Sequence, residues 1–238
     1  MIYNLDIFDP ASGRDRHEIR IVQIGEIARH DLGYGKFRED SALWIIHEPS
    51  IREKDYDLLS ATYGNIPGPA VIVPYLYENG KWRETQQLFG PIQIGGYNAF
   101  DSVAHQEWEL LDDSRTILGL ECKAARTNFR GRDWIAWYAP ELAYPAGPWK
   151  LGGLPGLILL AEDASGEYKM EARQLRHGSG PILRKYDKFA VLSREKLHNL
   201  VRQANEYPFR NPIYNPNGGE NPRANERSFY NPIEKSLN

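Results

Sequence analysis

The stretch TILGLECKAAR, residues 116–126, gives the clearest strand signal in the chain. Apolar and charged side chains alternate along it. The even positions hold Leu118, Leu120, Cys122 and Ala124, and the odd positions include Glu121 and Lys123. Because successive side chains of a strand point to opposite faces, this pattern predicts a strand over 116–126 with one inward face. The only cysteine, Cys122, belongs to that inward face.

The next stretch, RGRDWIAWYA over residues 130–139, predicts a second strand of a different kind. Its apolar side chains fall on both faces: Trp134, Ala136 and Tyr138 on one, Ile135 and Trp137 on the other. A strand that is apolar on both faces is expected to be covered on both sides. We therefore place residues 130–139 centrally in a sheet.

Further strand signals extend outward from this pair. Residues 3–8 and 17–24 predict an opening hairpin, and residues 71–77 and 82–89 predict another, joined through Asn79-Gly80. Residues 107–111, 156–162 and 167–175 also have strand character, with turns expected at 112–114 and 163–166. Strands this closely spaced without helices between them predict a mainly β protein with a curved antiparallel sheet.

Two helices and a tail complete the expected architecture. Spacing of apolar residues predicts a short helix over 35–46 and a longer one after Ser193, which suits an N-cap, with Glu195 in its first turn. Beyond Tyr207 the sequence is rich in Asn and Pro, which disfavours regular structure. We expect one β-rich domain over 1–207 and an extended tail over 208–238 that packs partly on it.

Composition excludes several classes of protein. The 238 residues carry a formal net charge of −3, which argues against a nucleic-acid binder. The chain is not expected to span a membrane, since no run approaches the roughly 20 apolar residues required. The N-terminus lacks the pattern of a signal peptide, which leaves a cytosolic protein and an exported one with its signal removed as alternatives. A single cysteine fits both.

A resemblance to a known family bears on this choice. The segment GPWKLGGLPGLI, residues 147–158, contains the signature after which the GLPGLI family of exported bacterial proteins is named. Residues 117–124, the FRGR and AWY segments at 129–132 and 136–138, and the ending at 230–234 are also similar to that family. The resemblance implies a periplasmic or cell-surface location and no established reaction. The strand order also resembles the half-barrels of periplasmic lipoprotein carriers, an analogy of fold alone.

The loop 147–158 has two interpretations. In the favoured one its prolines and glycines form a rigid plug at one end of the sheet, with Trp149 and Leu154 as core anchors. In the other, the loop is a docking surface. Exposure of Trp149 discriminates between them.

The two arginines at Arg130 and Arg132 also have two interpretations. Placed two apart on one strand, they can form a fork for an anion, or they can pair with acidic side chains and loop carbonyls of this chain, which is the commoner fate. The same holds for Lys150. The candidate surface for a partner or ligand comprises Arg130, Arg132, Trp137, Tyr138, Trp149, Lys150, Leu154 and Pro155.

No motif in the sequence gives convincing support for a catalytic or metal-binding site. Ser193-Arg194-Glu195-Lys196 matches a Ser-x-x-Lys pattern, but an N-cap role explains Ser193. The six histidines show no metal-binding spacing, and an inward Cys122 is expected to be inert. We expect no cofactor.

The leading functional hypothesis is a non-enzymatic exported protein. It would bind an envelope protein, a peptide or a lipid-like apolar ligand through the curved sheet and the loop 147–158. One alternative is a hydrolase whose site is assembled only in three dimensions, and another is a structural component of the envelope.

Overall fold

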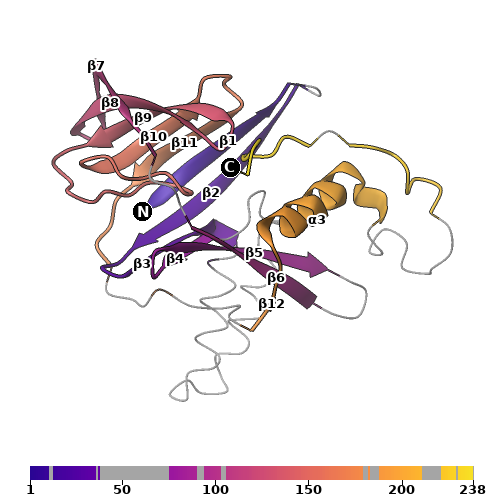
Figure 1. Ribbon diagram of the computed structural model, residues 1–238. Coiled ribbons are helices and arrows are strands. Elements are labelled where there is room, and N and C mark those ends of the chain that lie inside the picture. Colours follow the sequence, from indigo (N-terminus) through magenta and orange to yellow (C-terminus); the bar gives the residue numbers. More distant parts are fainter. Residues whose placement is uncertain are drawn as a thin grey trace, which may run out of the picture.

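The computed structural model describes residues 1–10, 13–35, 37, 75–89, 94–102, 106–178, 182, 188–210, 221–228 and 230–237. Within these ranges the protein is mainly β, with one open sheet of twelve strands (Figure 1). The strands are β1 (Ile2–Asp9), β2 (Arg14–Ile24), β3 (Ala28–Gly33), β4 (Tyr75–Glu78), β5 (Lys81–Phe89), β6 (Ile94–Asp101), β7 (Glu109–Ile117), β8 (Leu120–Phe129), β9 (Arg132–Ala139), β10 (Leu157–Asp163), β11 (Tyr168–Gln174) and β12 (Ala190–Val191). The helix α3 (Arg194–Glu206) and the 3-10 helix η2 (Pro208–Arg210) follow.

Two meanders make up the sheet. The order is β12-β6-β5-β4-β3-β2-β1-β11-β10-β9-β8-β7, so β1–β6 form one half and β7–β11 the other. The halves meet where β1 pairs antiparallel with β11, and the short β12 pairs parallel with β6 at one edge. The expected curved antiparallel sheet with few helices is confirmed. In Figure 1, α3 lies beside the β5–β6 end.

Both predicted hairpins form where the structure describes them. β1 and β2 pair from Ile2 opposite Ile21 to Asp9 opposite Arg14. The turn between β4 and β5 has positive φ at Asn79 and Gly80, as the Asn-Gly pair indicates. The proposed strand residues 71–74 lie outside the described residues, as does most of the helix expected over 35–46.

The strand expected over 116–126 is in fact divided by a tight turn. Leu118 and Gly119 have φ of +53° and +82°, and Ile117 pairs with Leu120 across this hairpin between β7 and β8. Leu118 is therefore exposed at the turn instead of facing inward, whereas Cys122 is fully buried as expected. Residues 112–114, where we expected a turn, belong to β7 at an irregularity in its pairing with β8.

The strand β9 begins later than expected. Arg130 and Gly131 form the turn before it, both with positive φ, so Arg130 does not share a strand with Arg132. β9 is an interior strand between β8 and β10, third from the β7 edge of the sheet. Its two faces enter two apolar clusters: Trp134 packs in one and Trp137 in the other.

The helix α3 has the predicted cap. The Ser193 hydroxyl accepts a hydrogen bond from the backbone N–H of Lys196 at 3.3 Å, and Glu195 lies in the first turn. After η2, residues 230–237 return to the sheet, where Ile233 is buried in the first apolar cluster. Among the described helices, none is long and apolar enough to cross a membrane.

Candidate functional site

The loop between β9 and β10 carries Trp149 and Lys150 into the interior. The loop is closed by a bridge between Ala146 and Gly152 and by a hydrogen bond from the Gly153 N–H to the Pro145 carbonyl. Trp149 adopts φ of +52°, and its backbone N–H donates to the buried carboxylate of Asp31. These contacts fix the direction in which the next side chain, Lys150, leaves the loop.

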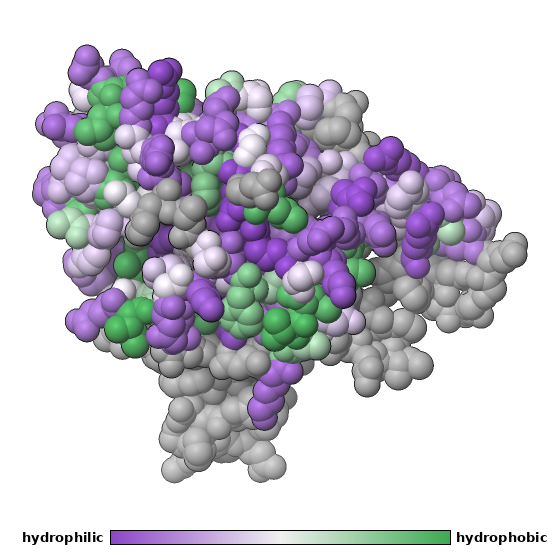
Figure 2. All heavy atoms as spheres, in the orientation of Figure 1, coloured by the Kyte–Doolittle hydropathy of each residue, from purple (hydrophilic) through white to green (hydrophobic). Residues whose placement is uncertain are grey.

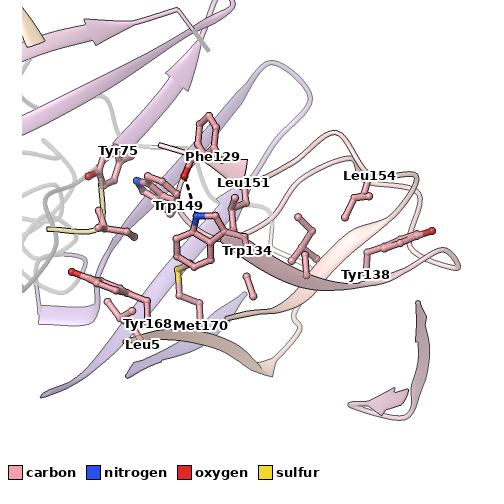
Figure 3. Packing of buried hydrophobic residues seen from close by; sticks show 14 of the residues in the cluster. Leu5, Tyr75, Phe129, Trp134, Tyr138, Trp149, Leu151, Leu154, Tyr168 and Met170 are labelled. Atoms are coloured by element: carbon pink, nitrogen blue, oxygen red, sulfur yellow. Dashed lines mark hydrogen bonds between the residues drawn. The ribbon is translucent and has the colours of Figure 1, made fainter. Parts of the chain in front are cut away.

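The Trp149 indole is packed among other aromatic rings. It lies 5.6 Å from the ring of Trp134 and 5.4 Å from that of Phe129 (Figure 3). The exposed fraction of Trp149 is 1%, and that of Leu154 is also 1%. The loop is therefore a plug of the core, as the favoured interpretation has it, and its tryptophan is not a docking surface.

The ammonium group of Lys150 is the centre of a buried charge cluster. Its Nζ donates to the carboxylates of Glu84, Asp101 and Glu234, the latter two at 2.8 and 2.6 Å. Glu84 belongs to β5, Asp101 ends β6, and Glu234 comes from the last residues of the chain. Lys150 has no exposed side-chain surface, so it links two strands and the tail inside the protein.

Three more side chains complete this assembly, which we call the Lys150 cluster. Arg130 donates to both oxygens of Asp101 at 2.8 Å. From α3, Arg194 pairs with Glu234 and Glu84, and the His198 Nε2 lies 2.8 Å from the Glu84 carboxylate. Apart from His198, the cluster holds three cations and three carboxylates. Its charges are balanced.

Electrostatics within the cluster favour the ionised forms. Burial acts to raise the pKa of Glu84, but Lys150 and His198 outweigh it and hold that pKa well below its usual range. Burial likewise acts to lower the pKa of Lys150, and the surrounding carboxylates raise it overall. A buried ion pair of this kind is costly to break on one side only.

A second buried hub, which we call the Arg132 cluster, lies at the start of β9. The Arg132 guanidinium pairs with Asp163 at 2.5 Å and with Glu167 at 2.7 Å. It also donates to Asn231 and to backbone carbonyls of the tail, and Lys235 pairs with Glu167 at 3.2 Å. Glu167 has a pKa of about 2: burial opposes this lowering, but hydrogen bonds from Arg132, Lys235 and Asn231 outweigh it. Both arginines singled out by sequence thus pair internally, although from different elements.

The remaining candidate surface residues are also mostly interior. Trp137, Tyr138 and Leu154 are buried, while Pro155 is exposed. The Arg115 guanidinium lies 4.0 Å from the centre of the Trp137 ring. Seven of the eight residues predicted to form a partner or ligand surface are therefore core or cluster residues in this structure.

The side chains of Glu84, His198 and Glu234 also have the geometry of a potential metal site. Their ligand atoms lie within 4.8 Å of one another. Both carboxylates are already neutralised by Lys150 and Arg194, whose positive charges would repel a metal ion. The group therefore fits an ion-pair network better than a metal centre.

Sequence reasoning missed most members of the Lys150 cluster. For Glu84 the sequence held a clue: it stands two residues after Trp82 on β5 and so shares a face of the strand with that apolar ring. In the structure both side chains are 1% exposed. Asp101, Arg194, His198 and Glu234 come from distant segments with no common spacing. The thiol of Cys122 is buried and its pKa is raised by that burial.

A groove of about 290 Å³ lies between β6 and α3. Its lining combines an aromatic ring, two leucines and three polar side chains: Tyr97, Leu192, Leu200, Lys196, Asn199 and Gln203. Phe100 on β6 and Val191 on β12 are exposed apolar residues of the same edge of the sheet. In Figure 2, hydrophobic side chains gather beside the mainly hydrophilic α3, in the place where Figure 1 shows β6.

Part of the chain is similar in sequence to a known domain, and most of it is similar in fold to solved structures. Residues 93–188, less than half of the chain, match the PNGase F-II family model described as N-glycanase peptide, N-terminal domain. Two solved structures of PNGF-II, in space groups P21 and C2, share the fold with TM-scores of 0.55 and 0.51 at 14% and 16% identity. They cover 86% and 84% of this chain, which spans 33% and 31% of theirs. No curated protein sequence gives a significant match. The chain is thus similar in fold to about a third of PNGF-II.

Proposed function

We propose that this chain is a non-enzymatic binding module of an exported, envelope-associated protein, and that its partner is an N-glycosylated peptide or protein. The observation that carries the non-enzymatic assignment is the Lys150 cluster. Its carboxylates are buried and paired with cations of the same chain, so they hold the fold together and are not available to move a substrate proton.

The groove between β6 and α3 is the proposed contact surface, in place of the buried loop 147–158. Tyr97 offers an aromatic face, and Asn199 and Gln203 offer amide donors and acceptors. Apolar faces with a few placed polar groups are typical of ligand sites. The match of residues 93–188 to an N-glycanase domain supports a glycan as the chemistry recognised, and the GLPGLI resemblance supports export.

The test is calorimetric titration with an N-glycosylated peptide and with the same peptide lacking its glycan. We expect binding of the glycosylated form only, lost in Tyr97→Ala and Gln203→Ala. Asn205→Ala is the matched control, because Asn205 is exposed on α3 and bonds only to its own helix among the described contacts. Equal binding of both peptides, or of neither, would reject the proposal.

A hydrolase is the second candidate, favoured by one observation. The His198 side chain is 25% exposed and lies 2.8 Å from the buried Glu84, an arrangement in which a carboxylate can orient an imidazole base. Mass spectrometry of the glycosylated peptide after incubation separates the candidates. Release of the glycan by the wild-type chain but not by His198→Ala supports the hydrolase, and an intact glycopeptide supports the binding module.

A further inference from the structure

The last residues of the chain lie against the sheet in the manner of a bound peptide. Tyr168 donates to the carbonyl of Asn231 at 2.6 Å, and Arg132 donates to those of Pro232 and Ile233 at 2.7 and 2.9 Å. The Leu237 carbonyl accepts from Arg130 and Arg194, and the N–H groups of Lys235 and Ser236 donate to the Arg130 carbonyl. We call the surface formed by Arg130, Arg132, Tyr168 and Arg194 the tail groove.

A buried apolar side chain and a close backbone approach fix which residue of the tail lies at each point of the tail groove. Ile233 is 8% exposed and belongs to the same cluster as Trp149. A Cβ added at Gly131 would lie 3.0 Å from the Lys235 Cβ and 3.1 Å from the Ser236 nitrogen, so the groove is shaped to the tail backbone. Residues 221–228 contact α3 and η2 instead, as in the hydrogen bond from the Ser228 N–H to the Glu206 carbonyl.

The charges of the tail complement both clusters. Without Glu234, the Lys150 cluster has three cations against the two carboxylates of Glu84 and Asp101. Without Lys235, the Arg132 cluster has one cation against the two carboxylates of Asp163 and Glu167. Adjacent residues of opposite charge therefore each supply what their cluster lacks, which selects for an acidic residue followed by a basic one.

We propose that the tail groove is a recognition site for an extended peptide with an apolar, an acidic and a basic residue in succession, and that residues 230–237 of a second copy of this chain can occupy it. The occupant follows from the segment already seated there, because exchange between two copies preserves every contact. Reciprocal exchange of an identical segment between two copies is a low-cost route to a dimer. This inference is independent of the groove between β6 and α3.

The first test uses the full chain with Ile233→Asp, which we expect to release the tail because it places a charge in the apolar cluster. Fluorescence anisotropy follows its titration with a labelled peptide of residues 230–237. We expect saturable binding, and at least about tenfold weaker binding when Glu234 and Lys235 are exchanged in the peptide. The wild-type chain binds less peptide, because its own tail competes at a high effective concentration.

Failure of the peptide to bind the folded Ile233→Asp chain would overturn the site. If that variant does not fold by circular dichroism, Ile233→Ala takes its place. It removes part of the anchor and keeps the polar contacts, and the same peptide selectivity is expected.

The second test asks whether another copy supplies the peptide. The Ile233→Asp chain, with an open groove, is mixed with Gly131→Val, whose groove wall is blocked but whose tail is unchanged. Light scattering after size exclusion should show a heterodimer in the mixture and a monomer in each sample alone. Two monomers in the mixture would reject exchange between copies.

Discussion

Replacement of Lys150 by Met removes the central cation of the Lys150 cluster and keeps a side chain of similar length. At 2.8 Å and an effective dielectric constant of about 20, one contact such as that with Asp101 is worth about 6 kcal/mol before desolvation. The substitution leaves three buried carboxylates with two arginines. Breaking a buried pair from one side costs about 3–5 kcal/mol, and we expect a loss of this size in the free energy of unfolding at pH 7.

The assay is urea unfolding followed by the fluorescence of the six tryptophans, among them the buried Trp149 next to the substitution. Lys123→Met is the matched control, since Lys123 is exposed on β8 and its replacement should change stability by less than about 0.5 kcal/mol. A lower midpoint at unchanged slope identifies a change in stability.

The pH dependence of this loss has a definite sign. In the wild type the pKa of Glu84 is lowered, so its contribution is complete above its unfolded pKa near 4.5 and is lost as pH falls below it. In Lys150→Met we expect burial to raise the pKa of Glu84, so that its carboxylate becomes protonated in acid. Protonation removes one unpaired buried charge and restores part of the variant's stability. The difference in stability should therefore shrink as pH falls from 7 toward 4.5. A loss under about 1 kcal/mol at pH 7, or one that does not vary with pH, would refute the reasoning.

Three further predictions follow from single contacts. Gly156→Ala should destabilise the protein strongly in thermal unfolding, because the new Cβ would lie 2.4 Å from the Ala139 carbonyl oxygen; unchanged stability would contradict this packing. Native Cys122 should resist alkylation by iodoacetamide and react once urea is added, since it is buried and its pKa is raised; rapid reaction of the native protein would contradict it. Glu167→Gln should lower stability at neutral pH, because Arg132 holds the Glu167 pKa at about 2. The difference in stability from the wild type should vanish as the pH falls from about 4.5 toward 2. Unfolding midpoints measured across this pH range test the prediction, and a difference that does not change with pH would count against it.

The strands were predictable because their signals are local. The apolar run along 132–139 and the Asn79-Gly80 turn act over a few residues, and the structure follows them. The turn at Leu118-Gly119 was missed because an apolar residue before the glycine continued the alternation, although an isolated glycine within a strand pattern is a known sign of a break. The pairing of β12 with β6 covers only two residues, too few for the side-chain alternation of a strand to be recognised in the sequence.

The candidate site was less predictable because it is tertiary. Lys150 and the arginines stood out in sequence, but their acceptors lie on β5 and β6, at and after the end of β10, and in the tail. The local pattern around Glu234 gives no clear sign of burial, since the residue stands between the apolar Ile233 and the polar Lys235 and Ser236. Burial of its carboxylate follows only when α3 and the tail are brought to the sheet.

The most direct measurement of the central claim, that buried ion pairs fix the end of the chain to the sheet, is native hydrogen exchange at Lys235 and Ser236. Their N–H groups both donate to the Arg130 carbonyl. We predict that they exchange slowly in the wild type, at rates comparable to those of β9, and rapidly in Lys150→Met. Exchange in the wild type at the rate of an unstructured peptide would contradict the claim.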